Sequence, residues 1–185
     1  TMGDPGGVGP EVVVKALASP AIRNICMPLV IGAPSIIEET LSLLEVALKT
    51  RGIESPEEYK HIKGVINIIG IDEKAELIKN KPTARSGKAC AGYIKKAVEF
   101  ALSGRVDGIV TAPISKEALK MANIQWPGHT EMLACLTKTK DYAMMLAGGP
   151  LRVILVTIHT AFKNVPVLIT KQKILKTIRL AKHAC

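Results

Sequence analysis

The sequence predicts an α/β protein with a mixed, mostly parallel sheet flanked by helices. Two short apolar runs, residues 27–32 and 65–69, are bounded by glycine or proline and are typical of buried strands. A third run at residues 108–113 ends at a proline, and segments with helical spacing lie between and after these runs. Such alternation favours a parallel sheet, because each parallel connection crosses the sheet through a helix.

The expected elements follow in order along the chain. A glycine-rich loop runs into a helix at residues 10–18, with Pro10 at its first position. Ser35 and Glu38 have the spacing of a capping box, which predicts a helix from Ser35 to about Lys49, closed by Arg51-Gly52. The remaining expectations are a helical turn at residues 55–58, a polar helix from residue 72, a linker at residues 79–88, a helix at residues 88–102 with Tyr93, Ala97 and Phe100 in its core face, a helix capped by Ser115, a hairpin of residues 142–146 and 151–158, and a helix at residues 171–185.

The composition excludes several classes of protein. A chain of 185 residues with 48% hydrophobic content is long enough for a globular domain with a core. No apolar run approaches the roughly 18 uninterrupted residues of a membrane helix. We therefore expect no membrane partner, and we find no signal peptide. The four cysteines are widely scattered without a CxxC pair, which suits the reducing cytoplasm.

The net charge of +9 is concentrated near the end of the chain. From residue 142 onward there is no acidic residue, and the basic residues are Arg152, Lys163, Lys171, Lys173, Lys176, Arg179 and Lys182. Aromatic residues make up only 3% and no nucleic-acid-binding signature is present, so we expect no nucleic-acid partner. The positive potential would instead favour anionic metabolites.

Both ends of the chain predict a fragment. The sequence starts at Thr1 without a leader, and it stops within a helical pattern that lacks a glycine or proline terminator.

The first candidate site is the sequence Trp-Pro-Gly-His-Thr-Glu at residues 126–131. Pro-Gly predicts a turn, and helix-forming residues follow it. His129 and Thr130 would then lie where a loop enters a helix, and the unpaired amides there could hold a phosphate or carboxylate. The alternative is that Thr130 is an ordinary N-cap and His129 a surface residue.

Three further features are candidates with open alternatives. Lys116 follows the predicted strand at residues 108–113, where it could contact an anion, transfer a proton, or be an ordinary surface lysine. The loop at residues 3–11 either approaches a ligand or is a tight structural turn, and it matches neither common phosphate-binding pattern. His159, expected at the end of a strand, could be a metal ligand, a base or a core residue.

Four motifs occur in order along the chain. They are Thr-Met-Gly-Asp-Pro-Gly-Gly-Val-Gly-Pro-Glu at residues 1–11, Asp-Gly-Ile-Val-Thr-Ala-Pro-Ile-Ser-Lys at residues 107–116, Pro-Gly-His-Thr-Glu at residues 127–131, and Val-Thr-Ile-His-Thr at residues 156–160 with Asn-Val-Pro at residues 164–166. With these motifs the chain closely resembles the N-terminal part of the 4-hydroxythreonine-4-phosphate dehydrogenase family of vitamin B6 biosynthesis, over essentially all 185 residues.

The resemblance implies a fold and a reaction. The fold would be three-layered and similar to the isocitrate and isopropylmalate dehydrogenases, but incomplete. Residues 1–185 would form the N-terminal part of a two-domain dehydrogenase whose cofactor-binding second half is largely absent. The reaction would be the NAD- or NADP-dependent, metal-assisted oxidation and decarboxylation of 4-phosphohydroxy-L-threonine, in the biosynthesis of pyridoxal phosphate.

The resemblance also implies roles for individual residues. His129 and Thr130 would contact the phosphorylated amino-acid substrate, and His159 would be one ligand of a divalent metal such as zinc, magnesium or cobalt. From their places at the sheet edge, and not from the resemblance, we assign Lys116 and the loop at residues 3–11 to the pocket wall, with Lys116 in a catalytic position. No cofactor-binding residue is assigned. The imidazoles of His129 and His159 would converge on one cleft. The protein would be a homodimer with a shared active site.

The sequence lacks several features of this family, so three hypotheses stay open, of which the first is a truncated dehydrogenase of the B6 pathway. Two further metal histidines and much of the nicotinamide site are not visible before Cys185, and a strand expected just before Thr1 is missing. We therefore predict that the chain alone is marginally stable and inactive. One alternative is a paralogue that oxidises phosphorylated threonate or erythronate. The other is a non-catalytic module that binds a phosphate ligand.

Overall fold

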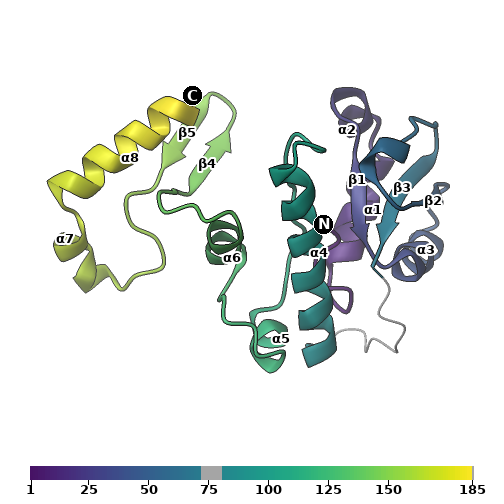
Figure 1. Ribbon diagram of the computed structural model, residues 1–185, viewed down its shortest axis with the longest axis horizontal. Helices are drawn as coiled ribbons and strands as arrows, with labels where there is room; N and C mark the ends of the chain where they lie inside the picture. Colours follow the sequence, from purple (N-terminus) through teal and green to yellow (C-terminus); the bar gives the residue numbers. More distant parts are fainter. Residues whose placement is uncertain (72–80, 185) are drawn as a thin grey trace. The chain divides into compact units, whose positions relative to one another are not determined.

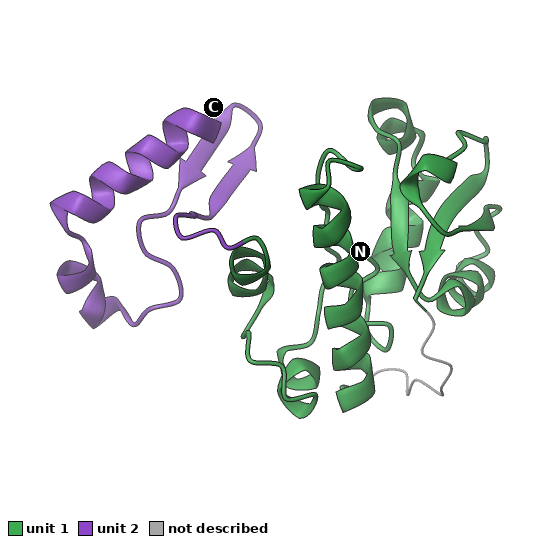
Figure 2. Ribbon diagram, in the orientation of Figure 1, with its two compact units in different colours: residues 1–137 green, residues 138–185 purple. Residues whose placement is uncertain are grey.

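The computed structural model describes residues 1–71 and 81–184, which divide into two compact units (Figure 1). Unit 1 comprises Thr1–Thr137 and unit 2 comprises Lys138–Cys185 (Figure 2). The polar helix expected from residue 72 lies outside the described residues.

Unit 1 is an α/β unit built on a parallel sheet. Its three strands lie in the order β1-β3-β2, and both pairings are parallel. Helix α3 packs against β2 and β3, and α4 packs against β1, so helices flank the sheet (Figure 1). The elements of unit 1 are α1 (Gly9–Ala18), α2 (Pro20–Ile25), β1 (Leu29–Gly32), α3 (Pro34–Leu43), β2 (Lys49–Ile53), η1 (Pro56–Glu58), β3 (Val65–Gly70), α4 (Ala84–Leu102), α5 (Lys116–Met121) and α6 (His129–Leu136). The expected α/β class with a parallel sheet is confirmed.

Strand β2 was not expected from the sequence. The predicted helix from Ser35 to Lys49 ends at Leu43, and no side chain caps its start, so the capping box at Ser35 is wrong. Its N-cap is Ala33, because Pro34 already occupies the first turn. Pairing with β3 decides the conformation of residues 49–53, because these largely polar residues carry no strand pattern of their own.

Two other boundaries differ from the prediction. Helix α4 begins at Ala84, because Thr83 and Ser86 form a reciprocal capping box there, so residues 84–88 of the expected linker belong to the helix. The expected strand at residues 108–113 is not a strand element, although its backbone is hydrogen-bonded to the first residues of the chain.

A large hydrophobic core holds unit 1 together. It joins the sheet to the helices on its faces, and Tyr93, Ala97 and Phe100 of α4 are buried in it, as their spacing predicts. Ile68 at the centre of β3 is fully buried. A second, smaller cluster joins α4 to Met132 of α6, and this cluster fixes where the start of α6 lies.

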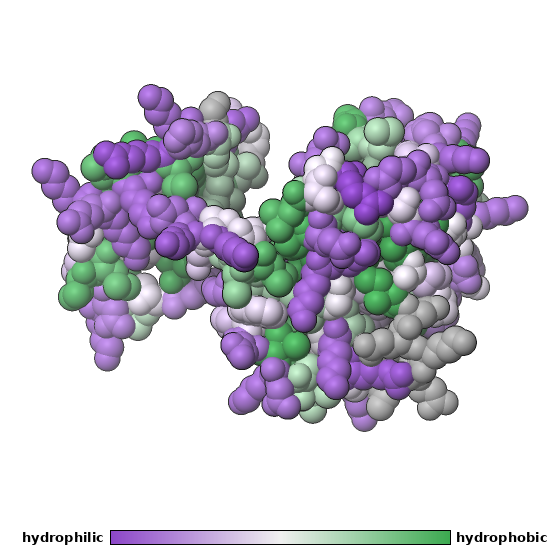
Figure 3. Space-filling model, in the orientation of Figure 1, coloured by the Kyte–Doolittle hydropathy of each residue, from purple (hydrophilic) through white to green (hydrophobic). Residues whose placement is uncertain are grey.

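Unit 2 confirms the last helix and a hairpin, but the strands do not have the expected bounds of residues 142–146 and 151–158. Its elements are the antiparallel strands β4 (Met145–Gly148) and β5 (Leu151–Ile154), η2 (Phe162–Asn164), α7 (Val165–Leu168) and α8 (Lys171–Ala184). Hydrophobic side chains lie at its surface (Figure 3). None of the helices in residues 1–71 and 81–184 combines the length and hydrophobicity that crossing a membrane requires.

Candidate functional site

The first residues of the chain lie between β1 and the segment at residues 110–113. The nitrogen of Thr1 donates to the carbonyl oxygen of Val110 at 2.6 Å, and Ala112 donates back to the carbonyl oxygen of Thr1 at 3.2 Å. On the other side, the Met2 nitrogen donates to the Ile31 carbonyl oxygen at 3.0 Å. This pattern is that of parallel pairing, so the loops that leave these segments start at the same edge of the sheet.

The glycine-rich loop is held closely against the next segment by Asp4. Its backbone nitrogen donates to the carbonyl oxygen of Pro113 at 2.9 Å, and its carboxylate accepts from the Gly6 nitrogen at 2.9 Å. Gly3 has a positive φ of 77° and a side chain there would clash with the Pro113 carbonyl, so this position requires glycine. The buried Asp4 was missed from the sequence, although its position before Pro-Gly-Gly is typical of a carboxylate that organises a turn.

Lys116 lies at the start of α5, directly after the segment that contacts this loop. Ser115 is the N-cap of α5, as expected, and its hydroxyl accepts from the Ala118 nitrogen at 3.1 Å. The Lys116 side chain is exposed. The structure therefore puts Lys116 at the same edge of the sheet as the glycine-rich loop, where its ammonium group is accessible to an anionic ligand.

Helix α6 begins with the two residues that the sequence singled out. Its N-cap is Gly128 and no side chain caps it, so the alternative that Thr130 is the N-cap is wrong. His129 and Thr130 occupy the first turn, where backbone amides lack partners within the helix. The Glu131 carboxylate also lies close to Gly128. Its negative charge opposes the attraction of the helix for an anion, so a ligand there needs side-chain donors as well.

His129 is half-buried rather than a simple surface residue. Its Nε2 atom is buried and has no hydrogen-bond partner among the described residues. Burial lowers the pKa of the imidazole below its ordinary value of 6.5, so the ring is neutral at pH 7. Because buried polar atoms almost always have partners, this atom is a candidate position for a bound water or ligand.

Packing holds α6 next to the segment at residues 110–113. Ile109 and Ile114, which flank that segment, both pack against the cluster that contains Met132 of α6. The positive charge at Thr1 adds to the effect of burial on the pKa of His129, as expected for groups that lie near each other. Unit 1 thus brings the start of α6 and the ends of two sheet segments into one region.

His159 lies in unit 2, beyond the end of the strand on which it was expected. Strand β5 ends at Ile154, so the expectation that His159 closes a strand is wrong. Residues 155–160 form no strand, and His159 has a positive φ of 48° and an exposed side chain. His129 and His159 belong to different units, and their convergence on one cleft stays a prediction.

The expected divalent metal requires more ligands than His159. An exposed imidazole can serve as one ligand, but protein metal sites normally use three or more side chains. Within residues 1–71 and 81–184, no three histidine, cysteine, aspartate or glutamate side chains gather in a way that could hold a metal. The described residues therefore do not supply the three protein ligands of a metal site by themselves.

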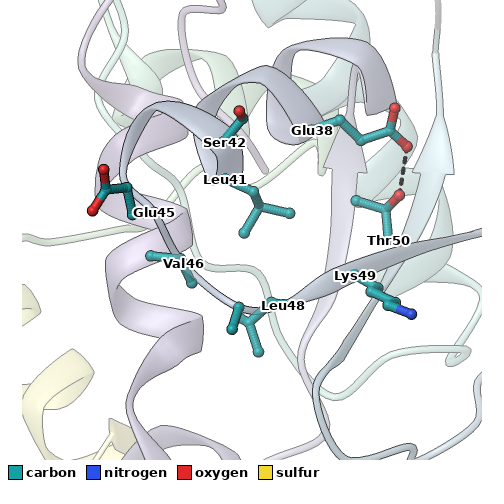
Figure 4. Close-up of a pocket in the computed structure, with 9 residues that line it drawn as sticks. Glu38, Leu41, Ser42, Glu45, Val46, Leu48, Lys49 and Thr50 are labelled. Carbon is teal, nitrogen blue, oxygen red and sulfur yellow. Dashed lines mark hydrogen bonds between the residues drawn. The ribbon is translucent and has the colours of Figure 1, made fainter.

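A hollow on the surface of unit 1 lies elsewhere. It has a volume of about 570 Å³ and lies between the end of α3 and β2 (Figure 4). Leu41, Val46 and Leu48 form its apolar floor, with Glu38 and Lys49 at the side. None of the candidate residues lines it, and its open shape offers few polar groups that converge on a ligand. We therefore place the candidate site at the start of α6.

Comparison with known proteins gives consistent matches. Residues 24–185 match the family described as pyridoxal phosphate biosynthetic protein PdxA. A 4-hydroxythreonine-4-phosphate dehydrogenase of Trichlorobacter lovleyi is 45% identical over 99% of this chain and 55% of that protein. A putative D-threonate 4-phosphate dehydrogenase of Fusobacterium nucleatum is 38% identical over 99% of this chain and 56% of that protein.

Solved structures agree with these matches. The crystal structure of a 4-hydroxythreonine-4-phosphate dehydrogenase from Burkholderia phymatum superposes with a TM-score of 0.89 at 41% identity, covering 96% of this chain and 54% of that one. The isocitrate and isopropylmalate dehydrogenase-like fold expected from the resemblance is therefore confirmed. The chain spans about half the length of the relatives it matches.

Proposed function

Because this chain belongs to the pyridoxal phosphate biosynthetic protein PdxA family, we propose that it acts as the N-terminal part of a 4-hydroxythreonine-4-phosphate dehydrogenase. In the proposed reaction, the carbon of the substrate's secondary alcohol transfers a hydride to NAD or NADP, and the hydroxyl group loses its proton. The resulting β-keto acid then loses carbon dioxide. The cofactor supplies the hydride acceptor, and the protein supplies binding and orientation.

The observation that carries this proposal is the unpartnered Nε2 atom of His129 at the uncapped start of α6. A neutral imidazole there can donate a hydrogen bond to a phosphate oxygen, and the Thr130 hydroxyl in the next position can donate another. Two such bonds orient the substrate, so that its reacting carbon faces the nicotinamide. In this proposal Lys116 lies in the wall of the same site, where its charge attracts the anionic substrate.

The remaining parts of the proposal concern the metal and the assembly. His159 would be one ligand of a divalent cation such as zinc, magnesium or cobalt, and the other ligands would come from outside the described residues. When bound, such a cation acts as a Lewis acid on the substrate. We also propose a cytoplasmic homodimer with a shared active site. The free thiols of Cys26, Cys90 and Cys135 support a reducing compartment.

The test uses the complete gene product that contains this chain, and turnover is followed by the reduction of NAD and NADP. We expect His129→Gln to lower kcat/KM for 4-phosphohydroxy-L-threonine by about 100-fold, because orientation is lost. His61→Gln is the matched control, since His61 is exposed in a loop of unit 1. Equal kcat/KM for the wild type and His129→Gln would contradict the proposal. The 185-residue chain alone is expected to show no turnover.

A second candidate function is the oxidation of a phosphorylated threonate. The match to the Fusobacterium nucleatum protein of that name favours it. The two substrates differ in carrying an amino or a hydroxyl group, so kcat/KM for each, measured with the same complete protein, decides between them. If phosphate binds but neither substrate is oxidised, the non-catalytic binding module remains.

A further inference from the structure

Thr1 carries the second buried polar atom that lacks a partner. Within the described residues, the buried side-chain nitrogen and oxygen atoms without a hydrogen bond are Nε2 of His129 and Oγ1 of Thr1. Thr1 is the residue at the centre of the pairing with residues 110–113, and its backbone is fully engaged there. Its hydroxyl is thus held in a fixed place by the sheet, without an internal acceptor or donor.

The two atoms lie in the same region of unit 1. Thr1 is hydrogen-bonded to Val110 and Ala112, and the residues on either side of that segment pack against the cluster that holds α6. The charge at Thr1 also contributes to the lowered pKa of His129, after burial. The rest of the described chain satisfies its buried side-chain polar atoms, so this coincidence distinguishes one region from the remainder of the unit.

The chemistry of the pair suits one ligand group. A threonine hydroxyl donates one hydrogen bond and accepts others, and a neutral imidazole nitrogen does one or the other. Together they fit a phosphate ester, whose oxygens accept several bonds from different directions. An apolar ligand would leave both atoms unsatisfied, which folded proteins avoid.

We propose that the hydroxyl of Thr1 is a further substrate-binding group, which hydrogen-bonds the same phosphorylated ligand as His129. The inference rests on the proposed function for the identity of the ligand, but the pairing of the two groups can be tested without turnover. Thr1 is a substrate-binding residue in this scheme and takes no part in proton or hydride transfer.

The test compares Thr1→Val, which keeps the shape and removes the hydroxyl, with Thr1→Ser, which keeps the hydroxyl. Both are made in the complete gene product. Thr50→Val is the matched control, because Thr50 lies on β2 and its hydroxyl donates to Glu38 in the other part of unit 1. We measure KM and kcat for both phosphorylated substrates, the binding of inorganic phosphate by calorimetry, and the melting temperature.

We expect Thr1→Val to raise KM and to weaken phosphate binding by about three- to tenfold, the effect of one neutral hydrogen bond. Thr1→Ser and Thr50→Val are expected to resemble the wild type in both measurements. In the double variant with His129→Gln, the loss of phosphate-binding free energy should be smaller than the sum of the losses in the two single variants, because both groups bind one ligand.

Two outcomes would overturn the inference. In one, Thr1→Val lowers the melting temperature while KM and phosphate binding stay unchanged, which means that the hydroxyl has a structural role. In the other, the wild type binds no phosphate. If the wild type oxidises neither substrate but binds phosphate, the proposed function fails, while weaker phosphate binding by Thr1→Val still supports the shared site.

Discussion

In unit 1 the sheet and its helices bury side chains such as Ile68, Tyr93 and Phe100, whereas no side chain of unit 2 is buried within residues 138–184. Unit 2 nevertheless contains as regular a hairpin and helix as unit 1 does. Many of its large hydrophobic residues, among them Leu151 and Phe162, are exposed instead. Unit 1 therefore combines regular secondary structure with a hydrophobic core, whereas unit 2 has regular secondary structure without buried side chains among residues 138–184.

The difference shows which interactions stabilise each unit. Full burial of one large apolar side chain contributes about 1.5–3 kcal/mol, and unit 1 has many such side chains. Unit 2 relies on backbone hydrogen bonds and local propensity, which alone leave short helices and hairpins marginal in water. We expect hydrogen exchange to be faster throughout unit 2 than in β3 or α4.

The largest expected effect on the free energy of unfolding comes from replacing one of the two phenylalanines of the chain, which lie one in each unit. Phe100 is 1% exposed and Phe162 is 90% exposed. Phe100→Ala should lower the free energy of unfolding by about 3–5 kcal/mol, because it removes core contacts and leaves a cavity. Phe162→Ala should change it by less than about 0.5 kcal/mol. Denaturant unfolding of the 185-residue chain measures both, and similar losses would break the comparison between the units.

Two glycines of α4 give the next test, which concerns how closely unit 1 is packed. A side chain at Gly87 would clash with the carbonyl oxygen of Ala118 in α5, whereas nothing lies near Gly92. Gly87→Ala should therefore destabilise the chain by about 1–3 kcal/mol. Gly92→Ala should stabilise it by about 0.5–1 kcal/mol, since alanine favours a helix. If Gly87→Ala unfolds at the same denaturant concentration as the wild type, the close contact of α4 with α5 is wrong.

A smaller effect is expected from the ion pair that joins η1 to Arg105, three residues after α4 ends. The Arg105 guanidinium, hydrogen-bonded to the Glu57 carboxylate, lowers the pKa of Glu57 from 4.5 to about 2. A lowered pKa in the folded state adds stability above pH 4.5, and this contribution disappears as the pH falls from 4.5 towards 2. The unfolding free energies of the wild type and Glu57→Gln should thus converge over that window. In an Arg105→Gln background the convergence should vanish, and its persistence would rule out the pair as the cause.

The smallest expected effect on stability comes from the protonation of His129. Burial keeps its pKa below 6.5 in the folded chain, so the unfolded chain binds a proton first as the pH falls. Stability from this group is complete above pH 6.5 and is lost as the pH falls from there to the folded pKa. NMR should show one imidazole that titrates below pH 6.5 and is missing from His129→Gln. A value at or above 6.5 would contradict the burial of this ring.

Much of the fold could be predicted from local patterns. Helix α1, strands β1 and β3, the β4–β5 hairpin and α8 follow from periodicity and from the glycines and prolines at their ends. Strand β2 could not, because residues 49–53 are largely polar and become a strand only beside β3. The Ser35 capping box failed for a local reason, since Pro34 starts the helix one residue earlier.

Part of the candidate site could likewise be predicted from the sequence, and part could not. Its residue types were recognisable, because Pro-Gly before His129 and Thr130 predicts a loop that enters a helix. The burial of Nε2, the N-cap at Gly128 and the pairing of Thr1 with residues 110–113 were not. The burial of Nε2 and the pairing of Thr1 depend on contacts between segments far apart in the sequence. The N-cap at Gly128 is a local backbone geometry.

The sequence by itself determined the α/β class, the order of most elements and the family to which the chain belongs, because these depend on periodicity, turn residues and ordered motifs. Only the tertiary structure decided that the first residues complete a row of parallel segments, and that two polar atoms near them are buried without partners. Burial and hydrogen bonding are properties of a residue's neighbours in space, and a one-dimensional pattern carries them only where those neighbours are also close in sequence.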